Sequence, residues 1–117
     1  MSPINRHLVE QCLIELSSRT DQLRLWRAVG PPEVSSFTEA FEQLFTDSGL
    51  DDPLHAGATG FGKECEQLLI ELETAMRSIN MRLNPDALIA TPEMDRVREL
   101  ATKALVSLQR NSVGGPM

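Results

Sequence analysis

The chain has 117 residues, 41% of them hydrophobic, which suffices for one folded domain and is too few for two ordinary ones. No apolar run approaches the roughly 18 residues that a transmembrane helix needs. The first residues lack the charged and apolar regions of a signal peptide, so we expect a cytoplasmic protein that does not enter a membrane. Acidic residues exceed basic ones by six, which argues against nucleic-acid binding because such a surface repels phosphate backbones.

Four segments show the periodicity of amphipathic helices, and none alternates as a strand does. Capping signals support them: Pro3 suits a first helical turn, Ser36 and Glu39 form a capping box, and Asn84-Pro85 ends the third segment. The sequence therefore predicts an all-α domain over residues 1–110 and a flexible tail over 111–117. The expected helices cover residues of about 3–29, 36–48, 61–83 and 92–110.

The chain contains an apparent internal repeat. Residues 10–16, Glu-Gln-Cys-Leu-Ile-Glu-Leu, recur at 66–72 with one difference, which is an offset of 56 positions. The same offset carries the helix start at Ser36 onto the start at Pro92. We therefore predict a four-helix bundle of two related helical hairpins packed about a pseudo-two-fold axis. Chance agreement between two amphipathic helices is the alternative, because such helices use Glu and Leu heavily.

Two pairs of apolar residues lie off the main apolar stripes of their helices. Ile14 and Leu25 share one line on the first helix, and Ile70 and Met81 occupy the equivalent positions after the 56-residue offset. Isolated apolar residues on a surface are normal, but symmetry-related pairs are less common. We interpret the four as a surface for a homodimer or another protein partner, with ordinary surface residues or burial in a wider bundle as the alternative.

A glycine-rich loop precedes the third predicted helix. Gly57–Lys63 fits the phosphate-loop pattern G-x-x-x-x-G-K, but Glu64 stands where a magnesium-binding hydroxyl belongs, and no strand precedes the loop. The alternative function is therefore a phosphate- or nucleotide-handling helical protein, phosphotransfer-like or metal-dependent, that uses residues 55–63. Its anion-binding residues would be His55, Gly60, Gly62 and Lys63.

No motif in the chain predicts a metal site, a cofactor or catalytic residues. The Glu-x-x-His pairs of di-iron bundles do not occur, and the chain has two histidines and two cysteines, the latter expected as buried free thiols. We therefore expect a non-enzymatic helical module, of adaptor, inhibitor or chaperone type. Its expected partner is another protein, with a homodimer as one form of the interaction.

Overall fold

The computed structural model describes residues 4–26, 36–80 and 82–113. All regular elements within these ranges are helices, which confirms the all-α prediction. The start at Pro3, the predicted turn at Gly30-Pro31-Pro32, Met81 and residues 114–117 lie outside the described residues. The elements are α1 (Arg6–Ser17), α2 (Arg19–Trp26), α3 (Phe37–Glu42), the π-helical η1 (Gln43–Asp47), α4 (Asp51–His55), α5 (Lys63–Arg77), α6 (Pro85–Ile89) and α7 (Pro92–Val113).

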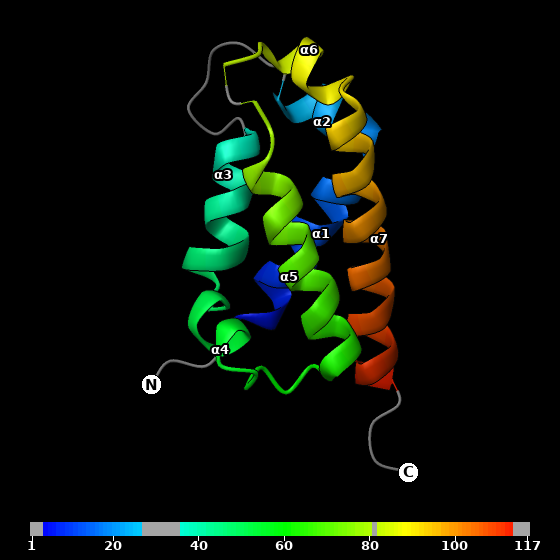
Figure 1. The fold of residues 1–117 in the computed structure, drawn as a ribbon. Coiled ribbons are helices and arrows are strands. Elements are labelled where there is room, and N and C mark those ends of the chain that lie inside the picture. The colour runs from blue at the N-terminus through cyan, green and yellow to red at the C-terminus, as the bar shows by residue number, and fades with distance from the viewer. Residues whose placement is uncertain (1–3, 27–35, 81, 114–117) are drawn as a thin grey trace.

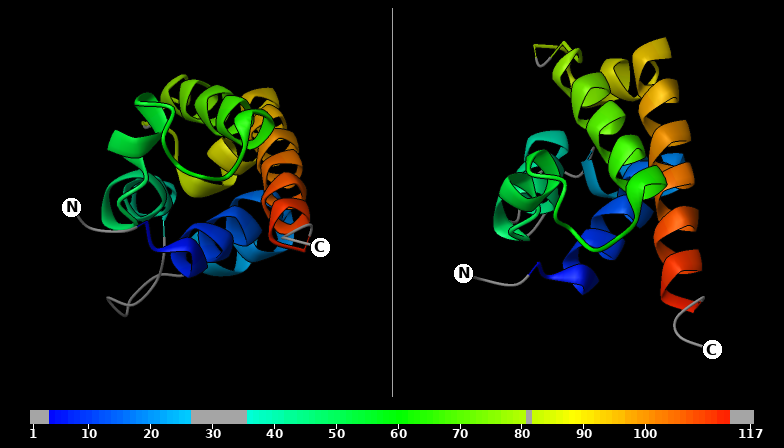
Figure 2. Two further views of the ribbon diagram at one scale, coloured as in Figure 1. Left: turned by 90° about the horizontal axis from the view of Figure 1, so that it is seen from below. Right: turned by 60° about the horizontal axis from the view of Figure 1, so that its bottom comes forward.

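The longest helices, α5 and α7, run antiparallel and pack along each other, and α1 packs against both α7 and η1 (Figure 1). Seen from below, α1, α7, α5 and the continuous α3–η1 segment surround a common core (Figure 2). Helices α2 and α6 meet at one end of the molecule, and α4 lies at the other. The largest fully buried side chains of the core are Phe45, Leu13, Leu16, Leu44, Leu50, Leu54, Leu69, Leu72, Met76, Ile89, Met94 and Leu100.

The first helix, predicted over residues 3–29, is two helices in its described part. Ser18 has an extended backbone (φ −113°, ψ 108°), and its hydroxyl accepts a hydrogen bond from the first turn of α2, as a helix N-cap does. The break removes the α-helical donors of the last carbonyl groups of α1, and the N–H of Ser18 donates to that of Glu15 at 3.3 Å. The buried Gln22 amide donates to two of them, those of Glu15 and Leu16, at 3.2 and 2.8 Å.

The second predicted helix, over residues 36–48, corresponds to α3 and η1. Ser36 is the N-cap expected from the sequence, because its hydroxyl accepts a hydrogen bond from the backbone of Glu39. The last turn is wider than an α-turn: the backbone N–H of Ser48 donates to the carbonyl of Gln43, five residues earlier. Together α3 and η1 cover most of the expected range, but the sequence does not predict the π-helical turn at its end.

Two boundaries and two short helices also differ from the prediction. Helix α5 ends at Arg77 rather than near residue 83, and α7 continues to Val113, so the backbone of the first predicted tail residues is helical. Helix α6 begins at Pro85 beyond the N-cap Asn84. Helix α4 lies between the helices expected over 36–48 and 61–83. It accommodates Pro53 because this residue occupies its first turn, where a missing N–H costs little.

Candidate functional site

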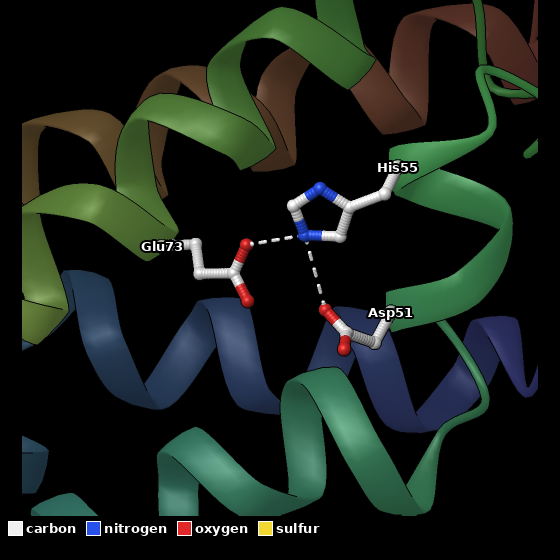
Figure 3. A group of neighbouring side chains, drawn as sticks. All are labelled: Asp51, His55 and Glu73. Atoms are coloured by element: carbon white, nitrogen blue, oxygen red, sulfur yellow. Dashed lines mark hydrogen bonds and ion pairs between the residues drawn. The ribbon is translucent and has the colours of Figure 1, made fainter.

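The best-defined cluster of functional side chains joins α4 to α5 (Figure 3). Asp51 and His55 lie one turn apart on α4, and both face Glu73 of α5. The imidazole Nε2 of His55 lies 2.9 Å from Glu73 Oε1 and 3.3 Å from Asp51 Oδ1. The three ligand atoms lie within 4.8 Å of one another. This combination of one imidazole and two carboxylates could hold a divalent metal ion.

The cluster has a buried side and an exposed side. Glu73 is only 4% exposed, and its second oxygen accepts a hydrogen bond from Arg77 at 3.2 Å. His55 is exposed, whereas Asp51 Oδ1 is shielded from solvent and accepts no hydrogen bond from any described residue. One side of the cluster is therefore open to water or a ligand, and the other is fixed in the protein.

His55 is a candidate functional residue from the sequence, whereas Asp51 and Glu73 are not. The Asp51–His55 spacing of four residues is the available signal, since it places both side chains on one face if the segment is helical. The sequence predicts no helix at this segment, which lies between the helices expected over 36–48 and 61–83. Glu73 has no comparable signal, because its burial depends on α4 lying across this face of α5, which is a tertiary contact.

The predicted anion site is arranged differently from what its motif suggests. His55 contacts the two carboxylates of the cluster, while Gly60 and Gly62 hold left-handed backbones (φ 80° and 96°) that shape the turn into α5. Lys63 is exposed at the start of α5. The motif residues thus serve a turn and a side-chain cluster, and anion binding by them stays a prediction.

The loop before α5 already holds a carboxylate from the protein itself. The backbone N–H and the hydroxyl of Thr59 both donate to Glu66, the N–H at 2.9 Å. The hydrogen bond from the hydroxyl, and to a lesser degree that from the N–H, lowers the pKa of Glu66 below its usual value. The N–H and hydroxyl of Thr59 are therefore already bound to Glu66 and are not available to a phosphate.

A shallow groove runs along the outer side of α5 and α7. It consists of two adjoining hollows of about 410 and 520 Å³ that share Gln67, and we call it the α5–α7 groove. Leu68, Ile70 and Val106 contribute apolar surface to it, and Val106 is 46% exposed. Charged side chains of both signs border this apolar surface.

Of the four residues predicted to form an interface, Ile70 alone is found in the described lining of this groove. Ile14 is 39% exposed on α1, and Leu25 is half-buried on α2. Met81 lies outside the described residues. Partner binding by these four positions therefore stays a prediction. Ile70 is the one that lies in the groove.

The two cysteines are free and buried, as expected from the sequence. Burial raises the pKa of Cys12 to about 12 and that of Cys65 to about 11, because a thiolate loses its hydration in the core. Glu15 raises the pKa of Cys12 further by charge repulsion. Both thiols are therefore protonated at neutral pH and poor nucleophiles.

Raising the pH is expected to destabilise the protein through these thiols. An unfolded cysteine loses its proton near pH 8.5, whereas Cys65 and Cys12 keep theirs until about pH 11 and 12, so the unfolded state binds fewer protons in between. The free energy of unfolding should fall as pH rises from about 8.5 through this range. Urea unfolding at pH 7.5 and at pH 10 measures this fall in the free energy of unfolding. The chain has no tyrosine, whose titration near pH 10 would add to the effect of the thiols. An unchanged pH slope in a Cys12→Ala, Cys65→Ala variant would contradict the assignment.

In the described ranges, no helix combines the length and apolar character needed to cross a bilayer. Comparisons with protein-family models, with curated proteins and with solved structures find no significant match.

Proposed function

We propose that this chain is a non-enzymatic helical module that binds protein, and that its partner at the α5–α7 groove is a second copy of itself. The observation that carries the proposal is the distribution of charge along the groove. The chain as a whole is acidic, with a net charge of −6, yet the charged residues that line the groove are balanced in sign. A balanced surface on an acidic protein favours contact with another acidic chain, such as its own copy.

The two ends of the groove have opposite charge. One end has one carboxylate and two cationic groups, a sum of +1, from Glu64, Lys103 and Arg110. The other end has two carboxylates and one cationic group, a sum of −1, from Glu71, Glu93 and Arg96. Between them, Glu99 pairs with Arg96 and with Lys103. Two copies related by a two-fold axis and packed antiparallel would place each positive end on a negative end.

The apolar part of the groove would be buried between the copies. Leu68 and Val106 of one copy would pack against Ile70 of the other, because these residues line opposite ends of the groove. Burial of this surface would supply the attraction that the charges orient. Two helices of this length offer a modest contact area, so we expect a dimer that dissociates on dilution.

Light scattering after gel filtration, over a series of concentrations, tests the dimer. Wild type is expected to approach twice the chain mass of 13.0 kDa. Ile70→Glu with Val106→Glu should weaken association at least about tenfold, because each change buries an unpaired carboxylate. Ile14→Glu distinguishes the groove from the surface predicted on α1, since Ile14 is similarly exposed but lies outside the groove; weaker association in this variant instead of the groove variant would place the dimer contact on α1. A wild type that stays monomeric at every concentration, or a groove variant that associates normally, overturns the proposal.

A charge exchange tests the antiparallel arrangement. Glu93→Lys should weaken the dimer by placing like charges together, and adding Arg110→Glu should restore it. Failure of the second change to restore association would contradict the antiparallel arrangement. The groove as the site of contact is tested separately, by the apolar variants.

We further propose that the domain is a four-helix bundle built from two related hairpins. Shifted by 56 positions, α1 falls on residues 62–73, which overlap α5. Three buried positions of α1 then coincide with three buried positions of α5: Val9 with Cys65, Leu13 with Leu69, and Leu16 with Leu72. Helix α2 falls on residues 75–82, and α5 covers only 75–77 of these. The likeness is therefore strongest for α1 with α5 and for α3–η1 with α7.

A further inference from the structure

We infer that Asp51, His55 and Glu73 form a binding site for one divalent first-row transition metal ion, with zinc as the best match, that fastens α4 to α5. The inference is independent of the proposed dimer, because it concerns a contact within one chain. It starts from two observations. One imidazole and two carboxylates converge from two helices, and one carboxylate oxygen, Asp51 Oδ1, is buried without a hydrogen-bond donor among the described residues.

Hydrogen bonding alone leaves this cluster incomplete. The Nε2 atom of an imidazole carries at most one hydrogen, so it can donate well to one carboxylate oxygen only. Its hydrogen bond at 2.9 Å goes to Glu73, and Asp51 Oδ1, 3.3 Å away, accepts none from the described residues. A buried oxygen of this kind is unfavourable. A divalent ion in place of the single proton would bind the nitrogen and both oxygens together as ligands, and its positive charge would attract both carboxylates.

The spacing of the ligand atoms is close to that of a metal site. Zinc bonds of about 2.0–2.2 Å place tetrahedral ligand atoms about 3.3 Å apart, and the two distances from Nε2 are 2.9 and 3.3 Å. The three atoms lie within 4.8 Å of one another, so a small side-chain rotation would bring the carboxylates into place. Asp51 and His55 are four residues apart on one helical turn, a spacing that directs both to the same ion.

The surroundings support one buried ligand and an open side. Arg77 holds the second oxygen of Glu73 by a hydrogen bond at 3.2 Å, which fixes the carboxylate so that the first oxygen faces His55. Glu73 would therefore bind through one oxygen. The side chain of His55 is 56% exposed, so water could complete the coordination from that side. An imidazole with carboxylates favours zinc, and cobalt as its probe, over magnesium or calcium, which prefer oxygen alone.

Calorimetric titration of untagged protein with zinc chloride tests the site. We expect one zinc ion per chain and a higher melting temperature in its presence, because the ion binds the folded state. His55→Ala and Asp51→Asn should each weaken binding at least about tenfold. His7→Ala is the matched control, since His7 is the other histidine and is exposed on α1. Equal binding by wild type and His55→Ala, or no binding by wild type at micromolar zinc, overturns the inference.

Two further measurements separate this site from other sources of binding. Cobalt bound by imidazole and carboxylates gives visible absorption without a thiolate charge-transfer band; such a band would place the metal at Cys12 or Cys65 instead and overturn the inference. Light scattering with and without zinc shows whether the ion lies within one chain. One zinc per two chains, with a doubled mass that requires zinc, would also overturn it. Circular dichroism of His55→Ala verifies that lost binding is not lost folding.

Discussion

Replacement of Arg98 by alanine is expected to lower the free energy of unfolding by about 3 kcal/mol, because it removes charged hydrogen bonds from a buried polar group. Arg98 is a side chain of α7 that is 11% exposed. Its guanidinium donates to the Gln22 side chain at 2.7 Å and to the carbonyl of Ile89 at 3.0 Å, and it pairs with Asp95 at 2.6 Å. Gln22 is fully buried, so its side-chain oxygen would lose a charged donor at a place shielded from water.

The loss should propagate because this group connects several helices. Gln22 also caps the last turn of α1, so Arg98 acts on α1, α2, α6 and α7 together. Arg24→Ala is the control: it removes an arginine of α2 whose side chain is 66% exposed and which lies outside the α5–α7 groove, and we expect a change within about 0.5 kcal/mol. Urea unfolding compares the two variants. Equal effects would show that the buried hydrogen bonds of Arg98 contribute little.

Leu13→Ala and Leu69→Ala are each expected to lower the free energy of unfolding by about 2–5 kcal/mol, through lost burial and the cavity left behind. Both side chains are fully buried, one on α1 and one on α5, and they occupy equivalent positions of the proposed repeat. We therefore expect similar losses from the two halves of the core. Ile14→Ala, next to Leu13 but 39% exposed, should cost less than about 1 kcal/mol.

Chemical denaturation measures these three variants with one signal, since Trp26 is the chain's single tryptophan and is buried. A loss below about 1 kcal/mol at Leu13 or Leu69 would contradict the placement of that side chain in the core. A large loss at Ile14 would contradict the exposed position of α1's outer face.

The sequence predicts this fold where local signals and burial agree. The N-cap at Ser36 and the apolar stripes of α5 and α7 belong to this class, because a helical period and a cap are properties of neighbouring residues. The break at Ser18 is not predicted by such local signals, since the apolar period of the sequence continues across it. A serine there can extend the helix or cap the next one, and the buried Gln22 amide makes the second arrangement favourable by satisfying the freed carbonyls.

The candidate site shows the same division more sharply. His55 stands out in a chain with two histidines, and Asp51 could have been paired with it from their spacing. Glu73 could not, because it resembles the solvent-facing glutamates beside it on α5 until α4 covers it. Residues brought together by tertiary contact carry no local signal, and the metal site depends on such a residue.

The wide turn of η1 has a consequence for the history of the chain. A π-turn spans one residue more than an α-turn, so a helix that contains one is a residue longer than a regular helix of the same reach. Before η1, buried positions of α3 match buried positions of α7 at an offset of 57: Phe37 with Met94 and Ala40 with Val97. Within and after η1 the offset is 56: Leu44 with Leu100, Phe45 with Ala101 and Ser48 with Ala104. Under the proposed duplication, η1 corresponds to a single-residue insertion in the first hairpin, absorbed as a bulge so that the side chains beyond it kept their inward direction.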